Sequence, residues 1–158
     1  MQLWLNCVTK DREQKMISIK KITEIARHVY KTLGPCHAES IYRDAMSIQL
    51  QEEGCIVKTE APISIYFTTK NKKKMIVGDG RIDLLVQSTK KKNDQIVMEL
   101  KCVSPLIKEG DKEKVKKSKE YIQLGKYLKS LKNPSKGLLI NFPFPPREDK
   151  DIEIITNP

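Results

Sequence analysis

The sequence lacks the patterns that mark several classes of protein. Its four cysteines are scattered without a C-x-x-C pair, and its two histidines complete no zinc-binding pattern. No stretch approaches the roughly 18 consecutive apolar residues of a membrane-spanning helix. The N-terminal MQLWLNCV is too short for a signal peptide and lacks its basic start. These absences favour a soluble intracellular protein, in the cytoplasm or nucleus, with reduced thiols and without a disulfide framework or structural zinc.

The composition is that of a globular, strongly basic protein. The 158 residues suit one domain, with 1–16 as an N-terminal extension, and an apolar content of 39% is too high for disorder. The formal net charge is +10, carried by 25 lysines and 5 arginines. Such a charge predicts a polyanionic partner, with nucleic acid ahead of an acidic membrane surface, but a solvated coat of lysines explains it equally well.

Hydrophobic periodicity predicts an α+β domain. Gly34-Pro35 ends the first helix, and Gly54 suits a left-handed cap after the second. The first three strands are expected to form an antiparallel meander, with a break at Pro62 in the first and a bulge near Gly78 and Gly80 in the second. The predicted elements are helices at 17–33 and about 37–53, strands at 55–69, 75–87 and 95–103, a helix at 110–132, and strands at 137–142 and 152–156.

One predicted strand, QIVMELKCV at 95–103, carries two charges among apolar neighbours. Because side chains alternate along a strand, Glu99 and Lys101 share one face. Two further E-x-K triplets, at 13–15 and 148–150, lie in polar surroundings where such charges are unremarkable. An uncompensated buried charge costs several kcal/mol, so the pair at 99 and 101 must be paired, exposed at an edge, or holding a metal.

The preceding predicted strand supplies a third charge, Asp83 in GRIDLLV. A hairpin joined across 88–94 can bring Asp83 next to Glu99, and two close carboxylates repel unless they share a proton or a cation. Mg²⁺ is commonly held by one or two carboxylates with phosphate and water, which would leave Lys101 facing the same pocket. An ion pair between Lys101 and Asp83 at a sheet edge accounts for the same residues, so both interpretations stay open.

Several stretches in order resemble a known family: LGPCHAESIYRDAMSIQLQEEG, GDGRIDLLV, VMELKCV, YIQLGKYL and GLLINF. Together they are similar to the GxxExxY proteins, small members of the PD-(D/E)xK nuclease superfamily, over roughly residues 20–157. The resemblance implies a restriction-endonuclease-like α+β fold with a central mixed sheet flanked by helices. One departure is Cys36, which stands where the motif opens on glycine; it removes no ligand.

The resemblance also implies a catalytic set. Asp83 and Glu99 match the two acids that bind metal in active relatives, and Lys101 matches the motif lysine, with the Leu100 carbonyl as a further ligand. Glu39 matches a helical glutamate that reaches the metal directly or through water, and Gln123 matches a glutamine near the active site. The implied function is cleavage of phosphodiester bonds, in DNA, with Mg²⁺ or Mn²⁺. The alternative is an inactive nucleic-acid-binding or protein-interaction module.

The flanking residues have plainer interpretations as well. Glu39 and Arg43 lie four residues apart and can form a surface salt bridge. Gln123 and Tyr127 have the same spacing and can form a polar face beside the buried leucines of the helix predicted at 110–132. Lysine-rich segments can contact phosphates, or simply be solvated turns. A homodimer is a further expectation, because related nucleases often pair to cut two strands. The residues assigned to nucleic-acid binding are Lys72, Lys73, Lys74, Lys90, Lys91, Lys116, Lys117 and Tyr127.

Overall fold

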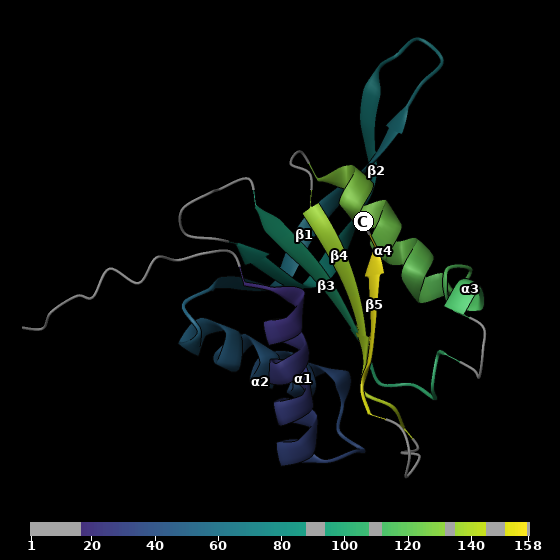
Figure 1. Cartoon of the computed structure of the whole chain (residues 1–158). Helices are drawn as coiled ribbons and strands as arrows, with labels where there is room; N and C mark the ends of the chain where they lie inside the picture. Colours follow the sequence, from purple (N-terminus) through teal and green to yellow (C-terminus); the bar gives the residue numbers. More distant parts are fainter. Residues whose placement is uncertain (1–16, 88–93, 108–111, 132–134, 145–150, 158) are drawn as a thin grey trace, which may run out of the picture.

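A mixed sheet with helices on both faces forms the centre of the molecule (Figure 1). The structure, a computed structural model, describes residues 17–87, 94–107, 112–131, 135–144 and 151–157. Its five strands lie in the order β1-β2-β3-β4-β5 within these residues. The elements are α1 (Ile19–Leu33), α2 (Glu39–Glu52), β1 (Ile56–Thr68), β2 (Lys74–Gln87), β3 (Gln95–Lys101), α3 (Lys112–Val115), α4 (Lys119–Ser130), β4 (Ser135–Asn141) and β5 (Glu153–Asn157).

The sheet combines an antiparallel meander with one parallel pair. β1, β2 and β3 pair antiparallel, as the sequence predicted, while β3 and β4 run parallel and are joined through α3 and α4. Leu138, Leu139 and Ile140 of β4 are fully buried because helices cover both faces, and the strand predicted at 137–142 is confirmed. β5 pairs antiparallel with β4 and forms the far edge.

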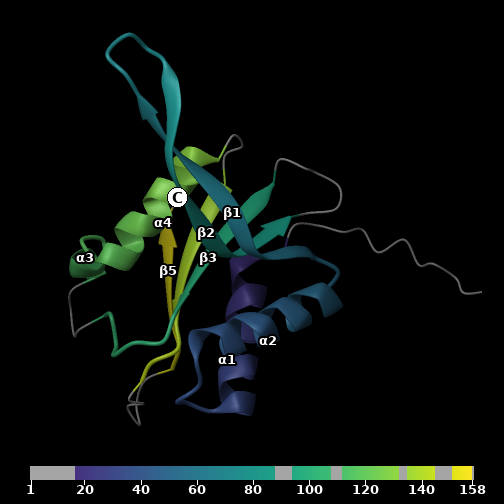
Figure 2. The same ribbon diagram turned by 180° about the vertical axis from the view of Figure 1, so that it is seen from behind.

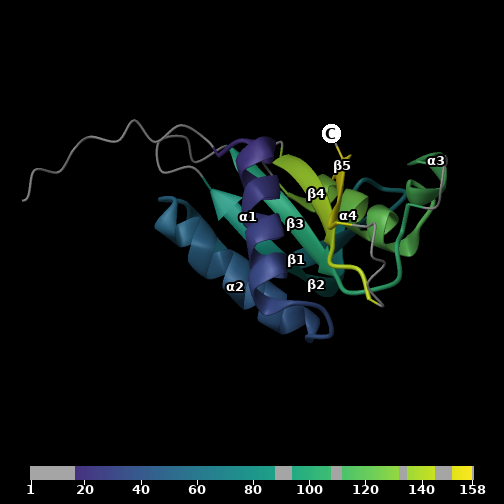
Figure 3. The same ribbon diagram turned by 60° about the horizontal axis from the view of Figure 1, so that its bottom comes forward.

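Helices α1 and α2 pack on one face of the sheet, and α4 packs on the other (Figure 3). The connection between α1 and α2 is fixed by Tyr42, which stacks on Phe142 with ring centroids 4.5 Å apart. The Tyr42 hydroxyl also donates to the carbonyl oxygen of Gly34 at 2.5 Å. Gly34 has a φ of 76° and Gly54 a φ of 85°, so both predicted helix stops use left-handed glycines.

Two expectations about element boundaries are wrong. The helix predicted at 110–132 is split, because α3 ends at Val115 and α4 begins after Ser118, whose hydroxyl accepts the Tyr121 N–H at 3.2 Å. The strand predicted to break at Pro62 is continuous. β1 is an edge strand and tolerates the missing N–H of proline there.

The β1–β2 hairpin extends beyond the rest of the sheet as a two-stranded ribbon (Figures 1 and 2). β2 pairs with β3 only from Leu84 to Gln87, whereas its pairing with β1 continues to Lys74. A register shift leaves Val77 without a partner in β1, which places the predicted bulge next to Gly78. We call residues 65–77 the arm.

No described helix is long and apolar enough to cross a membrane.

Candidate active site

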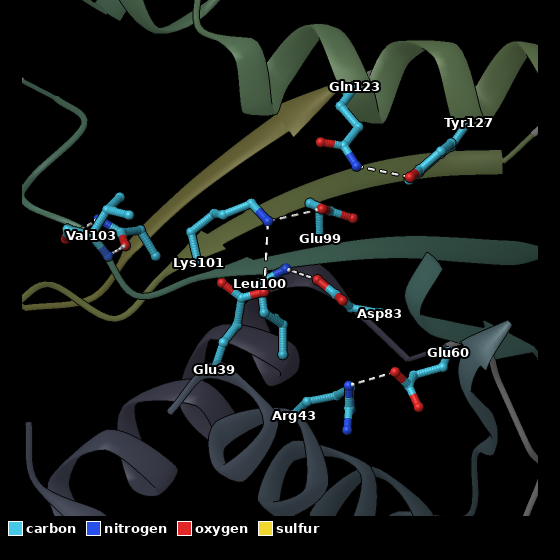
Figure 4. Close-up of polar contacts among 11 residues, drawn as sticks. Glu39, Arg43, Glu60, Asp83, Glu99, Leu100, Lys101, Val103, Gln123 and Tyr127 are labelled. Atoms are coloured by element: carbon cyan, nitrogen blue, oxygen red, sulfur yellow. Dashed lines mark hydrogen bonds and ion pairs between the residues drawn. The ribbon is translucent and has the colours of Figure 1, made fainter. Parts of the chain in front are cut away.

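The candidate site lies where β2 and β3 separate (Figure 4). Their pairing ends at Leu84 and Met98, so Asp83 and Glu99 are the next residues of the two strands. Beyond that point the Asp83 Oδ2 accepts the N–H of Leu100 at 2.7 Å and replaces the missing strand partner. The Leu100 carbonyl leaves the strand on the same side as its N–H, toward this gap. The proximity of Asp83 and Glu99, predicted from the hairpin, is confirmed.

Glu99 and Lys101 form a buried pair on one face of β3, as strand alternation predicted. The Lys101 Nζ lies 3.0 Å from the Glu99 Oε1. Only 3% of Glu99 is exposed, and its second oxygen, Oε2, is buried without a hydrogen-bond partner in the described part of the chain. A buried carboxylate oxygen without a donor is costly and indicates a place where a cation or a proton can bind.

Helix α2 brings a third carboxylate to the same lysine. Glu39, the first residue of α2, lies with its Oε1 3.6 Å from the Lys101 Nζ. The salt bridge between Glu39 and Arg43 that the spacing allowed is not the arrangement found, because Arg43 pairs with Asp44 and Glu60. The pair between Lys101 and Asp83 is also replaced, since Lys101 binds Glu39 and Glu99.

The electrostatics of the cluster favour an added positive charge. Burial, followed by the Asp83 carboxylate, raises the pKa of Glu99 to about 7, although Lys101 opposes the shift. Burial also raises the pKa of Asp83 and of Glu39 above the ordinary values. Burial alone would lower the pKa of Lys101, but Glu99 and the other acids outweigh it and raise that pKa. Three carboxyl groups thus share one ammonium, and ionising all three is unfavourable.

The donor set fits a small divalent cation bound by two carboxylates. Asp83, Glu99 and the Leu100 carbonyl are the hard oxygen ligands that Mg²⁺ and Mn²⁺ accept, and the unpartnered Glu99 Oε2 is the observation that favours such an ion. Among the described residues, however, no three His, Cys, Asp or Glu side chains are grouped to hold a metal. Glu39, paired with Lys101, is therefore not placed as a third direct ligand.

Gln123 and Tyr127 of α4 lie on the same side of the sheet as Glu99 (Figure 4). The Gln123 amide donates to the Tyr127 hydroxyl at 2.8 Å, so this glutamine is bound to a tyrosine of its own helix. The Tyr127 ring lies against the backbone of Gly80, where an added Cβ would come within 2.9 Å of the ring. The glycine at 80 therefore lets α4 approach β2 beside the site.

The lysines assigned to nucleic-acid binding come from three segments of the chain. Lys72, Lys73 and Lys74 lie at the tip of the arm and are exposed. Lys116 pairs with Glu113 at 2.8 Å, while Lys117 is exposed beside α4. The remaining two, at positions 90 and 91, lie outside the described residues, as do the E-x-K triplets at 13–15 and 148–150. Of the described lysines, Lys72, Lys73 and Lys74 thus lie on the arm, and Lys116 and Lys117 lie between α3 and α4.

Two polar networks beside the site were missed by the sequence analysis. Arg43 is largely buried and contacts Glu60, a non-glycine residue with a φ of 48° in β1. Asn141 and Glu153 form the second network, in which the Glu153 carboxylate accepts the Leu106 and Ile107 N–H groups at 2.8 Å. It also accepts from the Asn141 amide, so it fixes the segment that follows β3. The signal available in the sequence was a polar residue within a predicted strand: Glu60, Asn141 and Glu153.

The backbone at Cys36 bears on the one departure from the motif that the sequence resembles. It adopts a φ of 73°, in the left-handed region that glycine occupies freely. The position therefore requires the conformation for which the motif uses glycine, and cysteine adopts it at an energetic cost. Cys36, Cys55 and Cys102 are all free cysteines in the described part of the chain.

Comparison with protein families gives one match that covers most of the chain. The family model described as the PD-(D/E)XK nuclease superfamily matches residues 17–153. A search of curated proteins found no match. The matched region includes every carboxylate of the cluster, Lys101, and the helix that carries Gln123. The mixed sheet with helices on both faces agrees with the restriction-endonuclease-like fold of this superfamily.

Proposed function

This chain belongs to the PD-(D/E)XK nuclease superfamily, and we propose that it is a metal-dependent nuclease that hydrolyses phosphodiester bonds in DNA. The superfamily is typically composed of nucleases, which act on nucleic acid. The observation that carries the proposal is the buried Glu99 carboxylate, with an unpartnered Oε2, beside Asp83 and a paired Lys101. The ion pair with Lys101 accounts for only one of the two Glu99 oxygens.

Asp83, Glu99 and the Leu100 carbonyl would hold Mg²⁺ or Mn²⁺, and Glu39 would support the ion through water. When bound, the ion lowers the pKa of a coordinated water and offsets charge on the phosphate. The Leu100 N–H keeps the Asp83 carboxylate oriented toward the gap between the strands. Gln123, held by Tyr127, would order the side of the site that faces α4.

Lys101 supplies a fixed positive charge beside the reacting phosphate. In hydrolysis, the oxygen of a water forms a bond to phosphorus and that water loses a proton to solvent. The bond from phosphorus to the leaving oxygen breaks, and the leaving oxygen gains a proton from solvent. The ammonium of Lys101 stays protonated because its pKa is raised, and Glu99 and Glu39 hold its position. A fixed positive charge there orients the water and stabilises negative charge that develops on the phosphate.

The experiment is a cleavage panel on defined DNA and RNA, single-stranded and duplex, with Mg²⁺ or with EDTA. Asp83→Asn should abolish cleavage and leave the protein folded. Asp79→Asn is the matched control, because Asp79 is an exposed acid four residues earlier in the same strand. Equal cleavage by the wild type and Asp83→Asn would contradict the site assignment. Cleavage of RNA but not of DNA would show that the chain is a nuclease but that DNA is not its substrate.

A second candidate is an inactive nucleic-acid-binding module on the same fold. The observation that favours it is that Lys101 already pairs with two acids of the cluster, while the described residues group no three metal-ligating side chains. This candidate predicts that wild type and Asp83→Asn bind nucleic acid equally with or without Mg²⁺, and that neither cuts it. The cleavage panel therefore separates the two candidates.

Three further expectations belong to the same proposal. We take the chain as one domain of this fold, with 1–16 as an N-terminal extension. An intracellular location is proposed from the scattered cysteines. A homodimer is proposed because related nucleases often pair to cut two strands. Sedimentation of the wild type measures its oligomeric state directly.

A further inference from the structure

A groove of about 730 Å³ lies between the arm and helix α4. Figure 1 shows the arm rising past the end of α4. The β1 residues of the groove, Ile65 and Tyr66, are the first two residues of the arm. Among the described residues that line the groove, four are lysines and none is acidic. The lysines are Lys117, Lys119, Lys126 and Lys129.

The same lining contains apolar side chains that the fold leaves uncovered. Ile65 and Tyr66 come from β1, and Ile122 comes from α4; each has 40–47% of its surface exposed. The ammonium of Lys74 lies 4.2 Å from the Tyr66 ring centroid and adds positive charge beside this surface. The groove therefore offers apolar faces and several cations, without an acid to neutralise them.

The groove shares two lining residues with the α4 side of the candidate active site. Gln123 and Tyr127 line it, and both also lie beside Glu99 in Figure 4. Their mutual hydrogen bond and the close approach of Tyr127 to Gly80 fix this wall in place. A chain lying in the groove would therefore contact Gln123 and Tyr127, the two α4 side chains that lie on the same side of the sheet as Glu99.

We propose that this groove holds an unpaired strand of nucleic acid that leads into the active site. The proposal rests on the nuclease function proposed above. Phosphates of such a strand match the lysines, and its unstacked base faces match Ile65, Tyr66 and Ile122. A duplex hides its base faces in the stack, so it could use the lysines but not the apolar surface. The combined lining selects a single strand over a duplex.

The test measures binding in EDTA, so that no cleavage occurs. Fluorescence anisotropy compares a labelled single strand of about 15 nucleotides with the duplex of the same sequence. The wild type should bind the single strand more tightly. Tyr66→Ala and Ile122→Ala, which change exposed side chains and should leave folding intact, should each weaken single-strand binding about tenfold.

The lysines are tested by salt dependence. Replacing Lys119 and Lys126 together with glutamine should reduce the slope of log affinity against log salt by roughly 1.4, about 0.7 for each lost phosphate contact. The matched control replaces Lys20 and Lys31 with glutamine, because both are exposed on α1, which packs on the other face of the sheet. That control should leave the slope unchanged.

Several outcomes would overturn the proposal. These are no single-strand binding by the wild type, duplex bound as tightly as the single strand, or unchanged binding by both Tyr66→Ala and Ile122→Ala. A wild type that sediments as a dimer, and becomes monomeric with Tyr66→Ala, would show that a second copy covers the surface instead. The nuclease function is tested separately by the cleavage panel: if that function is absent, the wild type will cleave no substrate in Mg²⁺, whatever the anisotropy shows.

Discussion

Replacing Glu99 with glutamine should stabilise the metal-free protein at alkaline pH. Glutamine has the shape of the protonated carboxyl, and its carbonyl can still accept from Lys101. In the wild type, burial and Asp83 raise the pKa of Glu99 from 4.5 to about 7. The carboxylate is therefore disfavoured in the folded state and costs stability whenever it ionises.

The size and the pH range follow from that shift. A raised pKa means that the folded protein retains a proton which the unfolded chain releases, so the stabilising effect of the proton is complete below 4.5 and is lost as pH rises through about 7. At 1.36 kcal/mol per unit of pKa, the loss amounts to about 3 kcal/mol. In a protein of this size, that corresponds to roughly 6–12 °C in melting temperature.

Thermal unfolding in EDTA at about pH 5 and about pH 8 measures the effect. Glu99→Gln should melt close to the wild type at the lower pH and clearly above it at the higher pH. Glu24→Gln, an exposed isosteric change on α1, is the control and should show no such difference. A variant that melts at or below the wild type near pH 8 would refute the claim that this carboxylate is strained when ionised.

The remaining predictions concern residues around the cluster. Lys101→Met should lower the rate of Mg²⁺-dependent cleavage by about 10²–10³-fold, measured in single turnover, because a fixed cation beside the phosphate is lost; an unchanged rate would remove Lys101 from the mechanism. Gly80→Ala should destabilise the fold by about 1–3 kcal/mol in urea unfolding, since the new Cβ meets the Tyr127 ring. Gly78→Ala is the control and should not destabilise the fold, because nothing lies within 4 Å of the added Cβ. Similar losses of stability for the two variants would argue against this contact. Cys36→Gly should raise stability, by up to about 1 kcal/mol in the same assay, by relieving the left-handed cysteine; a loss of stability would mean that the Cys36 side chain contributes contacts worth more than the strain.

Much of the fold could be predicted because local pattern and tertiary environment agree. In α1 the helical spacing of the apolar residues indicates which face is buried, and in β4 the continuous apolar run indicates a buried strand. The pairing of Asp83 with Glu99 followed from one hairpin and strand alternation. The resemblance added Glu39, which no short-range rule connects to Lys101.

Other features depend on contacts that no local pattern contains. Ile65 and Tyr66 have the composition of a covered strand, and they are exposed only because β3 is too short to accompany β2 into the arm. Glu60 has a left-handed backbone conformation within β1, and its ion pair with Arg43 joins β1 to α2. The split at Ser118 did have a local cue, since serine favours a helix start, but the periodicity continued across it.

Calorimetric titration of Mn²⁺ tests most directly whether Asp83 and Glu99 form a cation site where β2 and β3 separate. The wild type and Asp79→Asn should each give one saturable binding heat near neutral pH. Asp83→Asn should give none, because half of the carboxylate pair is lost. A wild type without saturable heat, or an Asp83→Asn variant that binds Mn²⁺ like the wild type, would contradict the account.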